Sequence, residues 1–177
     1  KAVTISMPPV VAATRYVSPL GTHDWPYTNW AMAAHSIQTA IDASLAGDTV
    51  LVAKAVYYER ISFNGKDIVV GSTFLADGDT NAIAQTIIDG ESVGRVVTFS
   101  QGESGAALLS GFTIRNGRCA NGDGGGILCW CASPRLENLR IVGNESGLQG
   151  GGVSLQDSYA TVCNVAVLCN TARVSSG

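Results

Sequence analysis

Two aspartates in a short acidic loop are the side chains best placed to hold a metal ion. Asp77 and Asp79 flank Gly78, and Asn81 follows two positions later. Carboxylate and amide oxygens are the hard ligands that Ca²⁺ prefers, so calcium is the one cofactor that the sequence suggests. The spacing is not that of an EF-hand loop, and Asp and Gly also favour tight turns. We prefer the interpretation as a turn and expect no other cofactor.

Aromatic side chains offer a second kind of site. Trp25, Tyr27 and Trp30 cluster in one loop, and Trp130 lies far along the chain. Flat apolar rings with a polar edge are suited to stacking on sugars, so these four residues are candidate carbohydrate contacts. The alternative, which we prefer, is that Trp25 and Trp30 pack the loop onto a neighbouring helix.

The sequence assigns no catalytic residue. It contains no nucleophile elbow, phosphate-binding loop or zinc-protease helix motif. A glycosidase needs two carboxyl groups at one cleft, and the repeat described below aligns Glu137 and Asp157 with cysteines. Glu59, Arg60 and Lys66 are close enough in sequence to meet on neighbouring corners, but we interpret them as solvated surface charge. We therefore lean towards a protein that is not an enzyme.

The cysteines occur only in the C-terminal third of the chain. A zinc site is not expected, because the two histidines lie far away and the ligand spacing is wrong. In a secreted protein one or two disulfides would form, and an odd count leaves a thiol free or intermolecular. Buried thiols that pack as small apolar groups are the other interpretation. The five residues are Cys119, Cys129, Cys131, Cys163 and Cys169.

Composition restricts the class of protein. Hydrophobic residues make up 46% of the 177 positions, charged residues only 14%, and there are 21 glycines. The net charge of −3 comes without a basic run, which disfavours nucleic acid as a partner. No apolar run approaches the ~20 residues of a membrane span. The start at Lys1 fits a processed, secreted or cell-surface protein or an arbitrary boundary, and the former is our expectation.

Three regions follow from the periodicity of the apolar residues. Residues 1–29 read as an extended segment and an aromatic loop. Residues 30–47 carry an apolar stripe at helical spacing, with Thr28 or Asn29 as the expected N-cap and Gly47 as the expected C-cap. From residue 48 to residue 177, short β-type runs alternate with Gly, Asn, Asp and Ser. That spacing suits either a sandwich or a solenoid.

A repeat distinguishes between these two folds. Residues 124–144 align with residues 150–170 at a constant offset of 26 without a gap, and residues 109–114 align with 136–141 at offset 27. A period in the twenties with β-type runs indicates one solenoid coil per repeat. The register also aligns Asn144 with Asn170, which predicts a ladder of turn asparagines along the stack. We predict an all-β, parallel β-helix solenoid closed at its N-terminal end by the amphipathic helix.

The stretch SIQTAIDASLAGDTVLVAKAVYYERISFNGKDIVVGS at 36–72 resembles the cap and first coils of pectate-lyase-like right-handed β-helix proteins. Ala55 stands where those proteins usually have a glycine before the tyrosine. The units GGGI…IVGN and GGGV…VLCN also resemble polymorphic outer-membrane-protein repeats, with Ile141 and Val167 in place of phenylalanine. The resemblance implies a right-handed coil. It implies little about function, because this fold hosts lyases, hydrolases, adhesins and surface proteins.

No C-terminal cap is visible after the last repeat, which ends in NTARVSSG. Either the sequence is part of a longer protein, or the open end binds another subunit or another protein through its strand edges. In the second case residues 1–17 could add as a strand to a neighbour and build a filament. We expect an extracellular or cell-surface structural protein, adhesive or self-assembling. The alternative is a polysaccharide-binding or polysaccharide-lyase-like module of a longer secreted protein.

Overall fold

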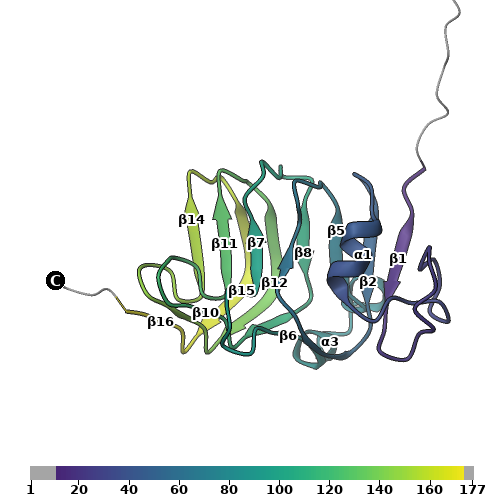
Figure 1. The fold of residues 1–177 in the computed structure, drawn as a ribbon, viewed down its shortest axis with the longest axis horizontal. Helices are drawn as coiled ribbons and strands as arrows, with labels where there is room; N and C mark the ends of the chain where they lie inside the picture. Colours follow the sequence, from purple (N-terminus) through teal and green to yellow (C-terminus); the bar gives the residue numbers. More distant parts are fainter. Residues whose placement is uncertain (1–10, 174–177) are drawn as a thin grey trace, which may run out of the picture.

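The computed structural model describes residues 11–173, and these form coils of parallel strands stacked around one core (Figure 1). The predicted all-β parallel solenoid is therefore confirmed. The extended run expected within residues 3–7 lies outside the described residues. None of the helices between residues 11 and 173 has the length and hydropathy that crossing a membrane requires.

The largest sheet runs the length of the solenoid, and every strand pair in it is parallel. The later coils cross it with one long strand, whereas the earlier coils use two short strands for the same wall. The strands pair in the order β1 (Thr14–Val17), β2 (Thr49–Val52), β5 (Val69–Ser72), β8 (Leu108–Ser110), β12 (Arg135–Val142), β9 (Thr113–Arg115), β6 (Thr86–Asp89) and β3 (Ala55–Tyr58), and β15 (Thr161–Leu168) pairs with the far side of β12.

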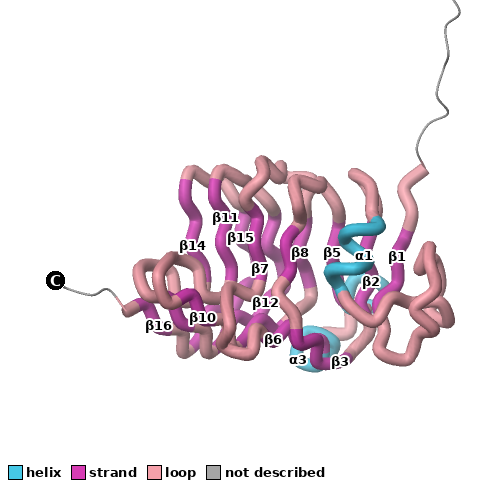
Figure 2. The backbone as a smooth tube through the Cα atoms, viewed as in Figure 1, coloured by secondary structure: helices cyan, strands magenta, loops and turns pink. Residues whose placement is uncertain are grey.

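Two smaller parallel sheets form the other walls of the coil (Figure 2). The predicted offset of 26 appears directly in their pairing, because Ile127 is the partner of Val153. Ile127 also pairs with Val97, which lies 30 positions earlier, so the preceding coil is longer. The first sheet contains β4 (Ile61–Ser62), β7 (Val97–Phe99), β11 (Ile127–Trp130) and β14 (Val153–Gln156), and the second contains β10 (Arg118–Cys119), β13 (Glu145–Ser146) and β16 (Thr171–Ala172).

The wall formed by the largest sheet bends at residues in the left-handed conformation, and these recur at the repeat offset. Gly111, Asn138 and Asn164 have φ values of 86°, 52° and 52°, at the point where β8 and β9 separate. Glycine adopts such angles without steric cost, and asparagine tolerates them better than most residues. Gly111, Asn138 and Asn164 therefore form one bend that recurs from coil to coil along the largest sheet.

The core fills the interior of the stack with ladders of like residues. Phe63 and Phe99 stack with their ring centroids 4.2 Å apart. Leu109 and Leu136, which are register partners, are both fully buried. Each interior row thus packs against the same row of the next coil, as expected for a solenoid whose single coils cannot bury their own apolar face.

Helix α1 (Ile37–Ala43) is shorter than the predicted helix over 30–47. Its N-cap is Ser36, whose hydroxyl accepts a hydrogen bond from the Thr39 N–H, and not Thr28 or Asn29. The preceding residues are not helical because the backbone of Ala34 pairs with β1. Its C-cap is Ser44 rather than Gly47. Two short helices that the sequence did not indicate, α2 (Phe74–Asp77) and α3 (Asn81–Gln85), lie between β5 and β6.

Helix α1 and the aromatic loop close the N-terminal end. The Tyr16 N–H donates to the Tyr27 carbonyl at 2.7 Å, and the Ala34 N–H donates to the Tyr16 carbonyl at 2.8 Å. These bonds occupy the outer edge of β1. On the opposite wall, the Gln38 side chain accepts from the Ser62 N–H at 2.8 Å and donates to the Ser62 carbonyl at 3.2 Å. The side-chain amide thereby occupies the edge of β4 as a strand backbone would.

Candidate functional site

The interior rows change from buried to exposed at the last described coil. Leu136 and Ile141 are fully buried, whereas their register partners on β15, Val162 and Val167, are 49% and 52% exposed. On the neighbouring wall, Leu155 of β14 is 44% exposed. Burying a valine or leucine fully contributes about 1.5–3 kcal/mol. Completing the burial of each of these three side chains would therefore contribute about 1 kcal/mol more.

The edge of this coil lacks the features that usually block strand addition. Residues 158–172 contain no charged residue and no proline. Natural edge strands are commonly protected by lysine, proline or an inward-pointing charge. Within residues 11–173, β15 pairs only with β12, and β14 only with β11. Within the described residues, the last coil, residues 153–173, therefore has a neutral, half-apolar outer face.

The asparagine ladder leads into this face. The Asn144 side chain is buried, with its Oδ1 accepting from the Gly117 N–H at 2.8 Å and its Nδ2 donating to the Ile114 carbonyl at 3.1 Å. Asn170 repeats the pattern one coil later. Its Oδ1 accepts from the Asn144 N–H at 2.8 Å, and its Nδ2 donates to the Ile141 carbonyl at 2.8 Å. The two side chains connect successive coils at one corner.

A second asparagine ladder was not anticipated. Asn164 Nδ2 donates to Asn138 Oδ1 at 2.7 Å, and Asn138 Nδ2 donates to the Ser110 hydroxyl at 3.3 Å. The repeat alignment contains the signal, because Asn138 and Asn164 are identical at offset 26. Beside this ladder, a groove of about 390 Å³ lies between α3 and the strands β12 and β15, with Ile83 and Leu168 among its lining residues.

All five cysteines are free thiols in the structure. Cys129 is buried, and this burial, with a smaller contribution from the charge of Glu103, raises its pKa to about 12. Cys129 thus behaves as a small apolar core residue. Cys119 is partly buried, whereas Cys131, Cys163 and Cys169 are exposed. Cys163 and Cys169 belong to the last described coil.

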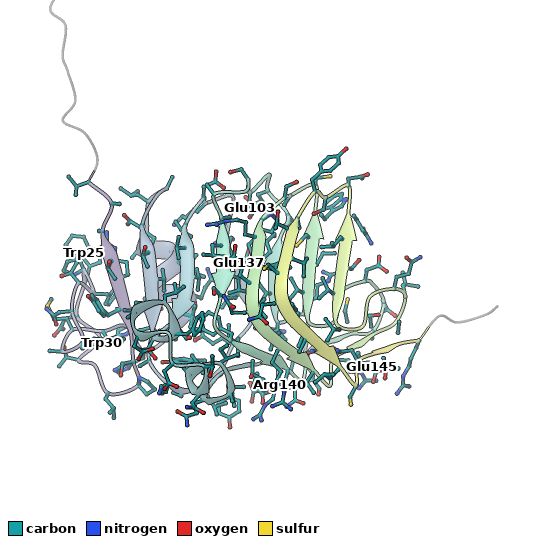
Figure 3. The ribbon with its side chains drawn as sticks, turned by 180° about the vertical axis from the view of Figure 1, so that it is seen from behind. Trp25, Trp30, Glu103, Glu137, Arg140 and Glu145 are labelled. Carbon is teal, nitrogen blue, oxygen red and sulfur yellow. The ribbon has the colours of Figure 1, made fainter. Side chains whose placement is uncertain are left out.

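The four aromatic candidates do not form one surface. Trp25 and Trp30 lie at the N-terminal end (Figure 3), 74% and 42% exposed, whereas Tyr27 is buried. The ring of Trp30 packs edge-on against Tyr16, with centroids 4.7 Å apart. Trp130 is half-exposed on β11, in a wall that begins with β4. Trp30 thus connects the aromatic loop to β1, whereas Trp130 lies in a different sheet, away from that loop.

The acidic loop is organised by contacts within the chain. Asp77 Oδ1 accepts from the Asp79 N–H at 2.9 Å, and Asp79 Oδ1 accepts from the Asn81 N–H at 3.0 Å. The remaining oxygen of Asp79 accepts from Lys54 Nζ at 2.7 Å. These hydrogen bonds lower the pKa of Asp79, with Lys54 making the largest contribution. The geometry is that of an acidic turn held by a lysine.

Charged side chains near β3 and β6 line a pocket of about 260 Å³ that includes Glu59, Arg60 and Asp89. Burial raises the pKa of Glu59, although its carboxylate accepts the N–H groups of Ile37 and Gln38. Burial acts on Asp89 in the same direction, but hydrogen bonds from the Glu91 N–H, Arg115 and Asn116 outweigh it and lower the pKa. Both carboxylates are therefore engaged in structural contacts.

Lys66 does not approach that pocket. Its ammonium group donates to the Ile41 and Asp42 carbonyls at 2.8 and 2.9 Å. These are carbonyls of the last turn of α1, where a positive charge complements the helix dipole. Glu59 and Lys66 thus bind opposite ends of the same helix.

Comparison of the chain with protein families, curated proteins and solved structures gives no match.

Proposed function

We propose that this chain is an extracellular or cell-surface structural β-solenoid that self-assembles through its last described coil. The observation that carries the proposal is the change along interior rows from fully buried to about half exposed, at Leu136 to Val162 and Ile141 to Val167. A second surface stacked on β15 would complete the burial. It would also pair the strand-edge groups that point away from β12.

Three further features support a structural role. The carboxylates of Asp48 and Asp89, which are buried, and of Glu59, which is partly buried, each accept hydrogen bonds from within the chain. The neutral composition of residues 158–172 lets like copies approach without repulsion. The resemblance to pectate-lyase-like coils and to outer-membrane-protein repeats, noted from the sequence, supports an extracellular location.

Sedimentation equilibrium over a wide concentration range tests the proposal. We expect the 177-residue chain to associate and Val167→Lys to remain monomeric, because a lysine on the interior row would bury an unpaired charge in the joint. Val11→Lys is the matched control, since Val11 is 82% exposed at the opposite end. We expect it to associate like the parent chain. A monomeric parent chain, or equal association of Val167→Lys, would overturn the proposal.

A polysaccharide-binding module is the second candidate. Tyr58, 64% exposed, lines the pocket that also contains Arg60 and Asp89, and an exposed ring beside charged groups suits a sugar. Calorimetric titration with acidic and neutral oligosaccharides tests this function. Saturable binding that Tyr58→Ala weakens at least tenfold would support it, and the absence of heat with either class would exclude it.

A further inference from the structure

The thiol of Cys119, on β10, lies beside a guanidinium group. A Cβ atom placed on Gly122 would stand 3.0 Å from Cys119 Sγ and 2.9 Å from Arg95 Nη2, so these two atoms flank one point. Arg95 Nε donates to the Asp123 carbonyl at 2.6 Å, which holds the guanidinium against the same loop. The Cys119 side chain is partly buried. The sulfur and the positive charge are therefore neighbours beside a gap that Gly122 leaves unfilled.

This gap, rather than the backbone conformation, accounts for a glycine at position 122. Gly124, two residues later, has a φ of 68°, whereas Gly122 is not in the left-handed region. The backbone at residue 122 is therefore open to residues other than glycine. An alanine there would crowd both Cys119 Sγ and Arg95 Nη2. The structure thus excludes a side chain at this point and leaves room for a small group between the sulfur and the guanidinium.

The next coil contributes a buried hydroxyl group that has no partner. Ser146 is the register partner of Cys119 in the parallel pair of β10 and β13, so the two side chains project from the same face of the sheet. The Ser146 side chain is fully buried, and no group within residues 11–173 forms a hydrogen bond with its Oγ. Buried polar groups are almost always hydrogen-bonded. The Ser146 hydroxyl therefore marks a place for one more polar atom next to the sulfur.

The acidic groups near this site do not neutralise the guanidinium. In the part of the chain that the structure describes, Arg95 has no carboxylate partner, because Asp123 meets it through the backbone carbonyl. The carboxylate of Asp123 instead accepts hydrogen bonds from a backbone N–H at 2.7 Å and a glutamine amide at 2.6 Å. Arg118 and Glu145 pair with each other at 3.6 Å. They precede Cys119 and its register partner by one position and so lie on the opposite face of the sheet.

We propose that Cys119 is a modification site, at which hydrogen peroxide oxidises the thiol to a sulfenic acid that Arg95 and Ser146 hold. The sulfur attacks one peroxide oxygen, so that an S–O bond forms and the O–O bond breaks. The other oxygen leaves with the thiol proton as water. The sulfur loses two electrons and the peroxide gains them. The new oxygen enters the gap beside Gly122, where Arg95 donates to it and the Ser146 hydroxyl gains its missing partner.

The other four thiols provide an internal comparison. Cys129 is buried, and Cys131, Cys163 and Cys169 are more exposed than Cys119. If exposure alone controlled oxidation, these three exposed thiols would react before Cys119. The proposed site reverses that order, because an electropositive environment favours the reaction of a cysteine with an oxidant. This inference does not depend on the self-assembly proposed above.

Treatment of the 177-residue chain with hydrogen peroxide in the presence of dimedone, which traps sulfenic acids, tests the proposal. Tandem mass spectrometry assigns each adduct to its cysteine. We expect Cys119 to be labelled about tenfold faster than the more exposed Cys131. Labelling of Cys119 at the rate of Cys131, or more slowly, would overturn the proposal.

Variants of Arg95 test the contribution of the positive charge. We expect Arg95→Gln to slow the labelling of Cys119 about 3–10-fold, because a charge-assisted hydrogen bond to the new oxygen is lost. Arg95→Lys, which keeps the charge, should recover most of the rate. Arg140→Gln is the matched control, since Arg140 is an exposed arginine of the largest sheet, and it should label like the parent chain. Parent-like labelling of Arg95→Gln would overturn the proposal.

The lifetime of the sulfenic acid tests the contribution of Ser146. Dimedone added at increasing times after removal of the peroxide measures how long the acid persists at Cys119. We expect Ser146→Ala to form the acid within about twofold of the parent rate and to lose it several-fold faster, because the hydrogen bond that holds its oxygen is missing. Far-ultraviolet circular dichroism checks that the variant keeps its strands. An unchanged lifetime in a folded Ser146→Ala would overturn the role given to this hydroxyl.

Discussion

The first coil of this solenoid and its last described coil are both built of parallel strands, but their outer surfaces differ. At the N-terminal end, Ile37 and Ile41 of α1 are fully buried against the first coil, and side chains occupy the strand edges. At the other end, the equivalent interior rows are about half exposed on β15. The comparison shows that stacking alone does not bury the interior side chains of a coil at an end of the described stack. Those side chains are buried only when an element that is not a further coil, such as α1, packs over them.

The largest difference between the ends should appear when an apolar side chain is removed from each. Ile37→Ala leaves a cavity beneath a sealed helix, so we expect a loss of about 2–5 kcal/mol in the free energy of unfolding. Leu155→Ala, at a side chain 44% exposed, should cost about 1 kcal/mol or less. Urea unfolding at low concentration measures both changes. Equal losses would show that the ends do not differ as described.

The asparagine ladder offers a finer version of the same comparison. Asn144→Ala removes partners from the buried Gly117 N–H and Ile114 carbonyl, and unsatisfied buried groups cost about 1–3 kcal/mol each. Asn170→Ala affects the partly open coil, where water can replace the lost bonds, so we expect about 1 kcal/mol. Thermal unfolding of the two variants compares them. A larger loss at Asn170 would contradict the described gradient of burial.

Two glutamates sharpen the comparison through charge. Glu59→Ala removes the acceptor for the Ile37 and Gln38 N–H groups at the start of α1, and loss of such a cap costs about 1 kcal/mol. Glu145→Ala removes surface pairs with Arg118 and Arg173, which contribute about 0–1 kcal/mol. We expect the first change to be the larger in chemical unfolding. High salt should reduce only the effect of Glu145→Ala.

The smallest expected effect concerns acid. Burial alone would raise the pKa of Asp48, but hydrogen bonds from the Ala13 and Leu45 N–H groups and the charge of Arg15 outweigh it and lower the pKa. A lowered folded pKa gives stability that is present above the unfolded value of about 3.9 and is lost as pH falls through the folded pKa. The last coil has no carboxylate between residues 158 and 172.

Asp48→Asn should therefore flatten the acid side of the curve of melting temperature against pH. Melting curves between pH 6 and pH 2 measure this change, with Asp24→Asn in the exposed loop as the control. If the parent chain and Asp48→Asn lose stability in parallel below pH 4, the carboxylate does not hold the N-terminal end as the structure indicates.

The repeat predicted the stacking of the coils, because residues one repeat apart in the sequence occupy equivalent positions in successive coils. Ile127 with Val153 and Leu136 with Val162 are partners in the sheets, as the offset of 26 required. The two short helices α2 and α3 carry no repeat, and each is at most five residues long. Their form depends on contacts such as the Thr113 hydroxyl donating to the Ile83 carbonyl, which no local pattern reveals.

The predicted length of helix α1 was wrong for a related reason. Residues 30–36 have helical spacing, yet the Ala34 backbone is drawn into pairing with β1. Long-range pairing outweighs local preference when a strand edge would otherwise stay open. The half-apolar face of the last described coil was expected only as a missing cap. Its character depends on which side chains become half-exposed. The exposure of Val162 and Val167 results from how the coils stack and cannot be predicted from the local sequence pattern.

The bend at Gly111, Asn138 and Asn164 has a consequence for how such a chain can change over time. The later coils bend at the same point of the wall, so a segment of 26 residues could be duplicated or deleted in the gene without shifting its neighbours out of register. The length of the solenoid could then change in evolution by whole coils.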